Sequence, residues 1–354
     1  MMIPQFAHFF NHFISSAGFF FFCLTEKRKC VSINDSDMNF SEAIMAIFTL
    51  TLNPAIDRHA ALDRLCPGSE HFAKELSCEF GGKGINLSRA LTANGCQNTA
   101  FVLLGRENAA FFEEGLNADA LTFRSFYTEG RVRENFTFHV PGEKETRISF
   151  QGFSATEEVF SQIATEIRGT VKPGDFLVVA GSFPTGITRR EVTGFLIGER
   201  ERGVKVISDS RSLGAEELYR IRPFLIKPND GEMALLTGKT IASREDALSA
   251  LKSVAANGIE HILLSLGEKG AFLSWDGKLF YEPAPAIEAL STVGAGDSML
   301  AGFLLALSAG KNEEDALKYA VAFGSAACLT PGTRPPRKDD ILHFLSISGA
   351  SLDK

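Results

Sequence analysis

The chain has 354 residues, of which 45% are hydrophobic, and this is enough apolar material for one large α/β domain or two average domains. Its formal net charge is −7, and an acidic chain without a basic cluster is a poor candidate for nucleic acid binding. Its six cysteines form no C-x-x-C pair, which argues against a zinc site and is typical of a reducing compartment such as the cytoplasm.

Residues 1–44 differ in composition from the rest of the chain. They contain the run Phe19 to Phe22, followed by the basic triplet Lys27-Arg28-Lys29. A signal peptide would carry its positive charges before the apolar run, and the run from Ile14 to Leu24 is shorter than the roughly 20 residues needed to span a bilayer. We therefore expect no membrane segment here. We hypothesise that Met45 is the true start and that residues 1–44 are a mis-started or disordered extension.

From Ile47 onward, short β-branched runs alternate with longer helical patterns, which is typical of a doubly wound, mostly parallel sheet flanked by helices. The uninterrupted apolar run Phe176–Ala180 is typical of a strand buried on both faces. In chain order, we expect strands at Ile47–Leu52, Thr99–Leu104, Phe176–Ala180, Val204–Ser208, Phe224–Ile226 and His261–Leu266, and helices at Ile85–Asn94, Ala109–Asn117, Arg189–Arg202, Glu232–Leu236 and Arg244–Asn257. This order predicts one α/β domain over residues 45–354.

Some segments break this rhythm, because polar and apolar residues alternate in them. Arg133–Val140 and Thr146–Phe150 are expected to be strands with one solvated face, and His59–Leu65 and Phe72–Cys78 could pair with them. We therefore expect a small antiparallel sheet, built from two insertions at about residues 57–80 and 123–150. Such a sheet could close as a lid over a ligand.

The strongest chemical signal is S-T-V-G-A-G-D-S, Ser291 to Ser298, directly before an apolar helix at Met299–Leu307. Its glycines allow a tight turn that points backbone N–H groups at one place, and the helix start adds partial positive charge. These groups could stabilise the charge of a transferring phosphoryl group. Asp297 could then take the proton from an attacking hydroxyl. Alternatively, Asp297 only caps the helix, which would stabilise it by about 0.3–1 kcal/mol.

A second glycine-rich turn, Gly81-Gly82-Lys83-Gly84-Ile85-Asn86, lacks the spacing of both a P-loop and a dinucleotide-binding loop. Lys83 could bind a phosphate as a point charge, and Asn86 could bind sugar hydroxyls. A tight turn with a solvated lysine explains the same residues equally well.

Two more loops follow predicted buried strands, where ligands of open α/β sheets bind. In Lys227-Pro228-Asn229-Asp230-Gly231-Glu232, the Asn229 amide and the Glu232 carboxylate could serve Mg²⁺, or they could simply cap the next helix. The loop from Ser265 to Gly270 could let a nucleotide approach its backbone, or it could be a plain hairpin turn.

These loops resemble, in their order, the PfkB/ribokinase family of carbohydrate kinases. The series is N-P-A-I-D (Asn53 to Asp57), G-G-K-G-I-N, Gly181-Ser182, K-P-N-x-x-E, S-L-G-x-x-G and S-T-V-G-A-G-D-S, and the resemblance runs from about Phe48 to the C-terminus. It implies the ribokinase-like fold with a small antiparallel β-sheet lid. It also implies transfer of a phosphoryl group from ATP to a sugar hydroxyl, with Mg²⁺ as cofactor. Members of the family frequently form homodimers through the lid, so the resemblance implies a homodimer here.

The resemblance also implies roles for single residues. Asp297 is expected to be the catalytic base, with Gly294, Ala295 and Gly296 forming the anion hole. Substrate-binding positions are Asp57, Gly82, Lys83, Asn86, Arg133, Asn135 and Ser182. ATP-binding positions are Lys227, Asn229, Ser265, Gly267, Gly270 and Thr292, and Asn229 with Glu232 is expected to organise Mg²⁺ mostly through water.

Within the family, several details resemble the branch that acts on phosphorylated sugars. Ser291 stands where sugar and nucleoside kinases of the family usually carry Asp, and Lys83, Arg133 and, more loosely, Arg106 could neutralise a substrate phosphate. The motifs T-L-N-P-A-x-D and G-G-K-G-I-N look most like those of 1-phosphofructokinases, which implies conversion of fructose 1-phosphate to fructose 1,6-bisphosphate. Tagatose-6-phosphate and fructose 6-phosphate kinases of the same branch are the alternatives. Glu134, where Ile is commoner in the family, is expected to face outward.

Two other classes of function would leave different residues in these motifs. A non-catalytic sugar-phosphate sensor with this fold would have lost the aspartate or the glycines of the last motif, and both are present. A nicotinamide-dependent oxidoreductase would need G-x-G-x-x-G after the first strand, where the chain has Asn53-Pro54 instead.

Overall fold

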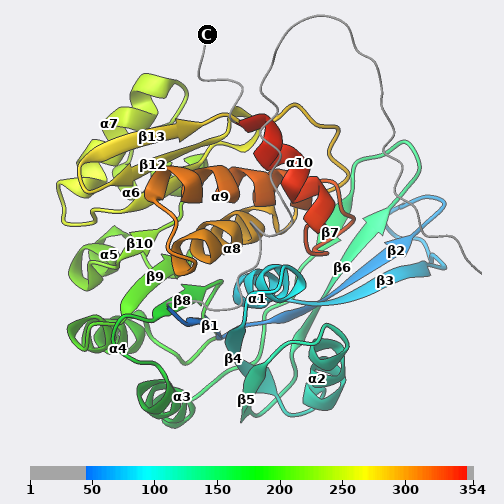
Figure 1. Cartoon of the computed structure of the whole chain (residues 1–354). Helices are drawn as coiled ribbons and strands as arrows, with labels where there is room; N and C mark the ends of the chain where they lie inside the picture. The colour runs from blue at the N-terminus through cyan, green and yellow to red at the C-terminus, as the bar shows by residue number, and fades with distance from the viewer. Residues whose placement is uncertain (1–44, 349–354) are drawn as a thin grey trace, which may run out of the picture. The chain divides into compact units, whose positions relative to one another are not determined.

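A computed structural model of the chain describes residues 45–348, so the expectations for residues 1–44 lie outside the described residues. The main sheet has nine strands, in the spatial order β13 (Lys278–Glu282), β12 (Ala271–Trp275), β11 (Ile262–Ser265), β10 (Leu225–Ile226), β9 (Lys205–Asp209), β8 (Phe176–Ala180), β1 (Ile47–Thr51), β4 (Asn98–Gly105) and β5 (Phe123–Thr128) (Figure 1). Strands β11 through β5 run parallel, and only β12 and β13 at one edge pair antiparallel. The order runs outward from β1 in both directions, so the sheet is doubly wound, as expected.

Helices cover both faces of this sheet and enclose two hydrophobic cores. One face carries α1 (Lys83–Ala93), α8 (Ala295–Ser308), α9 (Glu313–Ala327) and α10 (Lys338–Ser348); the other carries α2 (Ala109–Ala118), α3 (Glu157–Thr170), α4 (Arg189–Glu201), α5 (Ala215–Ile221), α6 (Asp230–Thr237) and α7 (Arg244–Ala255). Successive residues of β8 alternate between the cores: Leu177 and Val179 pack in one, Phe176 and Val178 in the other. This explains why β8 is an uninterrupted apolar run. None of the described helices is long and apolar enough to span a membrane.

The register of the central strands aligns their carboxyl ends at one edge of the sheet. Thr51, the last residue of β1, pairs with Ala180 of β8, and Ala180 pairs with Asp209 of β9. The loops that follow these strands therefore begin side by side. The loops after β1 and β8 carry two of the sequence motifs, Asn53 to Asp57 and Gly181-Ser182.

A second sheet of four strands, called the lid sheet below, has the order β3 (Lys74–Gly81), β2 (Ala55–Ala61), β6 (Arg133–His139) and β7 (Thr146–Ile148). Its outer pairings are antiparallel as expected, but the central strands β2 and β6 run parallel. The reason is connectivity, because β2 follows β1 and β6 follows β5, and both leave the same edge of the main sheet in the same direction. Figure 1 shows these strands extending away from the main sheet.

The second insertion is shorter than expected. Phe123–Thr128 was expected in the lid, but it forms β5 and pairs in parallel with β4 over Ala100–Gly105. Period-two alternation describes both an edge strand of the main sheet and a lid strand, so pattern alone did not separate them. The strand expected at His59–Leu65 also begins earlier, at Ala55.

Candidate active site

Residues from the carboxyl edge of the main sheet and from the lid sheet line one cavity of about 1410 Å³. All the residues that the sequence nominated, except Arg106, lie on its wall: Asp57, Gly82, Lys83, Asn86, Arg133, Asn135, Ser182, Lys227, Asn229, Glu232, Ser265, Gly267, Gly270, Thr292, Gly294, Ala295, Gly296 and Asp297. These residues come from loops, strands and helix starts spread along the chain from position 57 to position 297. The structure therefore brings together motifs that are weak individually.

The start of α8 presents backbone donors to this cavity. Gly294 is the N-cap residue and has φ +77°, a left-handed conformation that favours glycine. The first N–H groups of a helix have no partner within the helix, and the helix dipole makes them partly positive. Asp297 lies in the first turn with 6% exposure, so its carboxylate sits beside these donors.

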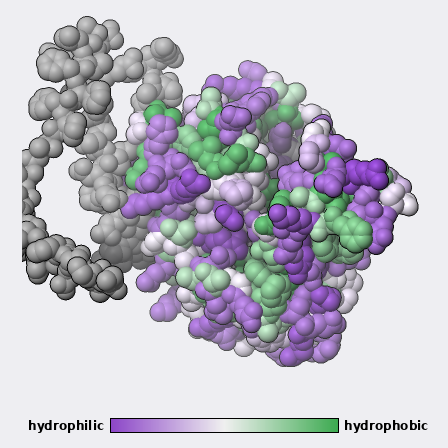
Figure 2. All heavy atoms as spheres, turned by 90° about the vertical axis from the view of Figure 1, so that its right-hand side faces the viewer, coloured by the Kyte–Doolittle hydropathy of each residue, from purple (hydrophilic) through white to green (hydrophobic). Residues whose placement is uncertain are grey.

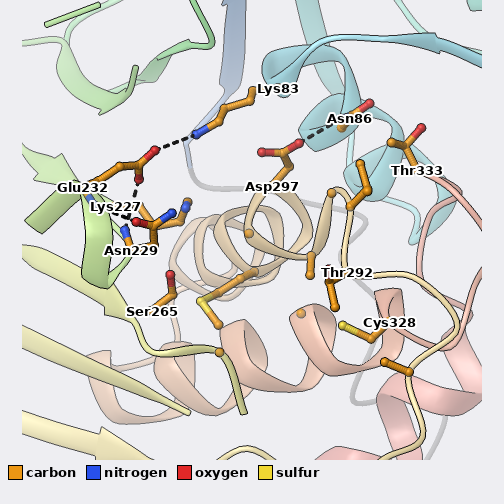
Figure 3. A pocket seen from close by; sticks show the side chains of 18 of the residues that line it. Lys83, Asn86, Lys227, Asn229, Glu232, Ser265, Thr292, Asp297, Cys328 and Thr333 are labelled. Carbon is orange, nitrogen blue, oxygen red and sulfur yellow. Dashed lines mark hydrogen bonds and ion pairs between the residues drawn. The ribbon is translucent and has the colours of Figure 1, made fainter. Parts of the chain in front are cut away.

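The surroundings of Asp297 favour a proton acceptor that is poised near neutral pH. Burial, with the nearby negative charge of Asp209, raises the pKa of Asp297 to about 6. Lys83, Asn86 and Lys227 act in the opposite direction. The Asn86 side-chain amide donates a hydrogen bond of 2.9 Å to Oδ2 of Asp297, as Figure 3 shows.

Lys83 and Lys227 are held by a buried aspartate that the sequence analysis missed. Lys83 Nζ donates to Asp209 Oδ1 at 2.7 Å, and Lys227 Nζ lies 3.5 Å from Asp209 Oδ2. Burial alone would lower the pKa of Lys83, but Asp209, Asp297 and Glu232 together hold that pKa above its ordinary value. The available signal was positional, because Asp209 is the last residue of a buried strand at the edge where ligands bind.

Asn229 and Glu232 form the helix cap that the simpler interpretation predicts, and they also line the cavity. Asn229 Oδ1 accepts from the Glu232 N–H at 2.7 Å, and Glu232 Oε2 accepts from the Asn229 N–H at 3.1 Å. The cap takes one lone pair of the Asn229 amide oxygen, so both side chains keep oxygen acceptors that can bind metal-bound water. Burial disfavours the Glu232 carboxylate, but Lys83 and Arg211 outweigh burial and keep its pKa below the ordinary value. An ionised Glu232 fits the role of an acceptor for metal-bound water.

The lid sheet contributes two arginines to the cavity. Arg147 donates to Asp57 Oδ1 at 2.7 Å, and Asn135 donates to the same oxygen at 2.9 Å. Arg133 donates to the backbone oxygens of Asn53 and Pro54 at 3.2 and 3.3 Å. Arg147, like Arg211, was not predicted, because neither stands in a motif.

Two other charged residues of this region do not line the cavity. Arg106, expected loosely near a substrate phosphate, has a 60% exposed side chain and lies 3.6 Å from Glu129, so that expectation was wrong. Glu134 pairs instead with Arg58 at 2.7 Å and with Arg131, in agreement with its expected outward orientation.

The part of the cavity wall that follows β11 combines a glycine-rich turn with apolar side chains. The turn Gly267–Lys269 joins the antiparallel strands β11 and β12, so the expected hairpin is present and it also lines the cavity. Gly270 has φ +93°, and a Cβ there would lie 2.1 Å from the Glu282 carbonyl oxygen, so no larger residue fits. Ala284 lies next to this turn, and the apolar residues Ile287, Val293 and Val321 also line the cavity.

Among the described residues, one cluster outside the cavity has side chains of metal-binding type: Glu260, His261 and Asp276. His261 Nδ1 lies 2.8 Å from the Phe224 carbonyl oxygen, and its Nε2 lies 2.8 Å from Asp276 Oδ1. Both ring nitrogens of His261 therefore have partners within the protein, so the contacts are accounted for without an ion. The cluster lies at the opposite end of β11 from Ser265.

A doubly wound sheet with a glycine-rich helix start, a buried carboxylate and clustered cations at its carboxyl edge defines an α/β protein whose site is suited to phosphoryl transfer. The sequence model of the pfkB family carbohydrate kinases matches residues 49–340. The chain belongs to this family, and it is accordingly a phosphotransferase of the kind that uses an alcohol group as acceptor.

Individual relatives agree with this assignment. The chain is 30% identical over 283 residues to a 1-phosphofructokinase of Haemophilus influenzae, covering 80% of this chain and 90% of that protein. It is 28% identical to a 1-phosphofructokinase of Escherichia coli, covering 79% and 90%. A solved structure of Escherichia coli phosphofructokinase-2 in complex with substrates and products aligns with a TM-score of 0.80 and 27% identity, covering 86% of this chain and 100% of that one.

Proposed function

We propose that this kinase transfers the γ-phosphoryl group of ATP to fructose 1-phosphate and forms fructose 1,6-bisphosphate. The observation that carries the proposal is the position of Asp297, a buried carboxylate with a pKa of about 6 beside the amide donors of α8. Support for the acceptor comes from the relatives named 1-phosphofructokinase. Tagatose 6-phosphate and fructose 6-phosphate are the alternative acceptors, and a structural neighbour is phosphofructokinase-2 in complex with fructose-6-phosphate.

In the proposed mechanism, Asp297 accepts the proton of the attacking sugar hydroxyl. A carboxyl group with a pKa near 6 is mostly ionised at neutral pH and can still take a proton in the transition state. Asn86 holds one oxygen of this carboxylate through its 2.9 Å hydrogen bond, so the other oxygen is available to the hydroxyl. The N–H groups contributed by Gly294, Ala295 and Gly296 stabilise the negative charge on the transferring group.

The substrate's own phosphate would be held by the lid sheet. Arg133 and Arg147 line the cavity beside Asp57 and Asn135, which can bind sugar hydroxyls. A guanidinium group matches the geometry of a phosphate through two parallel hydrogen bonds. Arg147 is 43% exposed, so it can turn from Asp57 to a phosphate, while Asn135 still donates a hydrogen bond to Asp57.

The nucleotide would lie against Ser265, Gly267, Gly270 and Thr292, with Lys227 and Asn229 near its phosphates. The apolar residues of this wall are suited to the face of a purine ring. Glu232 and Asn229 would hold Mg²⁺ through water, and a bound Mg²⁺ neutralises phosphate charge. We also propose that this reaction takes place in the cytoplasm.

An ADP-release assay with fructose 1-phosphate, fructose 6-phosphate and tagatose 6-phosphate tests the acceptor. We expect the highest kcat/KM with fructose 1-phosphate, and a higher value with either other sugar would assign the acceptor differently. Asp297→Asn should lower kcat by about 10²–10⁴-fold and leave ATP binding unchanged, because the amide keeps the shape but accepts no proton. Binding of a sugar phosphate without turnover by the wild-type protein would favour the sensor.

We further propose that two copies associate through the lid sheet. Large apolar side chains are exposed on or beside its strands, namely Phe72 (88%), Leu76 (55%), Ile148 (47%) and Phe150 (51%). Figure 2 looks at this side of the molecule and shows green apolar patches among the purple hydrophilic surface. Sedimentation equilibrium of the wild-type protein and a Phe72→Ser/Leu76→Ser variant tests this, because a monomeric wild type would contradict the proposal.

A further inference from the structure

One contact joins the lid sheet to the loop after α9. Glu79 lies on β3, and its Oε2 accepts hydrogen bonds from the backbone N–H of Thr333 at 2.8 Å and from the Thr333 hydroxyl at 2.7 Å. The two residues are 254 positions apart in the chain. Gly332 makes this approach possible, because a Cβ there would lie 2.2 Å from Glu79 Oε1. We call the Glu79–Thr333 contact the latch.

The lid end of the latch is tied to the acceptor side of the cavity. Glu79 is paired with Asp57 across β2 and β3, and residues paired across antiparallel strands lie on the same face of the sheet. Two residues after Glu79 the chain enters the turn that carries Gly82, Lys83 and Asn86. Arg89 of α1 donates to the Phe80 carbonyl oxygen, which fixes the end of β3 to this helix. Glu79 is therefore joined directly to the residues proposed to face the sugar.

The other end of the latch is tied to the donor side. Thr333 is 8% exposed and lines the cavity, as Figure 3 shows. It packs against Gly294, because a Cβ on Gly294 would lie 3.7 Å from Thr333 Cα. In the same loop region, the Cys328 carbonyl oxygen accepts from the Leu290 N–H at 2.8 Å, and this bond holds the beginning of the Ser291–Ser298 motif. Thr333 is therefore packed against the residue at which α8 begins.

We propose that Glu79 is a positioning residue whose latch to Thr333 couples the sugar-binding lid to the phosphoryl-binding start of α8. Neither residue is assigned a contact with the reacting atoms. The inference rests on the proposed function, since it assumes a sugar phosphate on one side of the latch and a nucleotide on the other. When the lid closes on the sugar, the latch draws the loop of Thr333 and Gly294 into place, so each ligand binds more tightly in the presence of the other.

The test measures the coupling between the two ligands. Calorimetry gives the Kd of a non-hydrolysable ATP analogue without fructose 1-phosphate and with saturating fructose 1-phosphate, and the ratio of the first Kd to the second is the coupling. For the wild-type protein we expect a ratio within the usual allosteric range of about 5–150. Glu79→Ala should bring the ratio to within about 2-fold of one and lower kcat, while the Kd of each ligand alone changes little. Glu79→Gln should retain the coupling, because its amide oxygen can accept the same two hydrogen bonds.

Glu75→Ala is the matched control, since Glu75 is on the same strand but pairs with Arg58 at 2.7 Å. It should leave both kcat and the ratio unchanged. Thr333→Val, which removes one of the two bonds, should lower the ratio partially and covers the case in which Glu79→Ala does not fold. Equal ratios in the wild type and in a folded Glu79→Ala or Thr333→Val protein would overturn the latch. No turnover by the wild type on any of the three sugar phosphates would instead refute the proposed function.

Discussion

Asn86→Ala should move the acid limb of the pH–rate profile to higher pH. The Asn86 amide donates a 2.9 Å hydrogen bond to Asp297 and thereby favours the ionised carboxylate. Hydrogen bonds to charged groups contribute about 1.5–3 kcal/mol, and one pKa unit corresponds to about 1.4 kcal/mol. Losing this bond should therefore raise the pKa of Asp297 by about 1–2 units, from about 6 to about 7–8.

The measurement is kcat/KM from about pH 5 to about pH 9, because this quantity reports the ionisation of the free enzyme. ADP should be quantified in quenched samples, so that no coupling enzyme is exposed to the varied pH. A loss of sugar binding would lower kcat/KM equally at every pH, whereas a change in the base moves the limb. An unchanged limb in Asn86→Ala would show that Asp297 is not the group whose ionisation limits the reaction.

Asp209→Asn should shift the acid limb of the pH–rate profile in the opposite direction, to lower pH. The negative charge of Asp209 raises the pKa of Asp297, and its removal also frees Lys83 and Lys227 to favour the Asp297 carboxylate. The acid limb should therefore move below about pH 6. General damage to the site would not move the limbs of Asn86→Ala and Asp209→Asn in opposite directions.

Arg147→Ala should raise the KM for the sugar phosphate about 10–100-fold, since a charged hydrogen bond contributes about 1.5–3 kcal/mol, and steady-state kinetics beside the exposed control Arg106→Ala would check this. A comparable rise in both variants would contradict the role of Arg147. Glu282→Gln should stabilise the protein by about 1–3 kcal/mol at about pH 8 and less at about pH 5. Burial raises the pKa of Glu282 to about 7 from 4.5, so between these values the unfolded chain releases a proton that the folded protein keeps, and stability falls as pH rises. Urea unfolding at both pH values measures the difference, and equal stabilisation at both would refute it.

Much of the fold could be predicted because its signals are local. The apolar run of β8 and the capping residues of α6 depend on neighbours within a few positions. Strand pairing depends on residues far apart, which explains why β5 was assigned to the wrong sheet and why the parallel pairing of β2 with β6 was not foreseen.

The residues of the candidate site also divide into those that a local sequence pattern identifies and those that it does not. Residues in glycine-rich turns were found because such turns leave a recognisable pattern, whereas Asp209, Arg147 and Glu79 stand in ordinary strands. Each acts through a partner more than 50 positions away: Asp209 through Lys83, Arg147 through Asp57 and Glu79 through Thr333. No spacing rule connects such pairs, so only the folded structure identifies them.

The charge balance of the site explains how an acidic protein can hold anionic ligands. Three carboxylates (Asp209, Glu232 and Asp297) face three cations (Lys83, Lys227 and Arg211), so the cluster is close to neutral before any ligand binds. An incoming phosphate must therefore compete with Asp209 or Glu232 for a lysine or arginine. Of the two lysines, Lys83 is the better placed to change partners, because it is 28% exposed while Lys227 is 4% exposed. When Lys83 turns toward a phosphate, its attraction for the Asp297 carboxylate weakens, and the base becomes more basic as the substrate arrives.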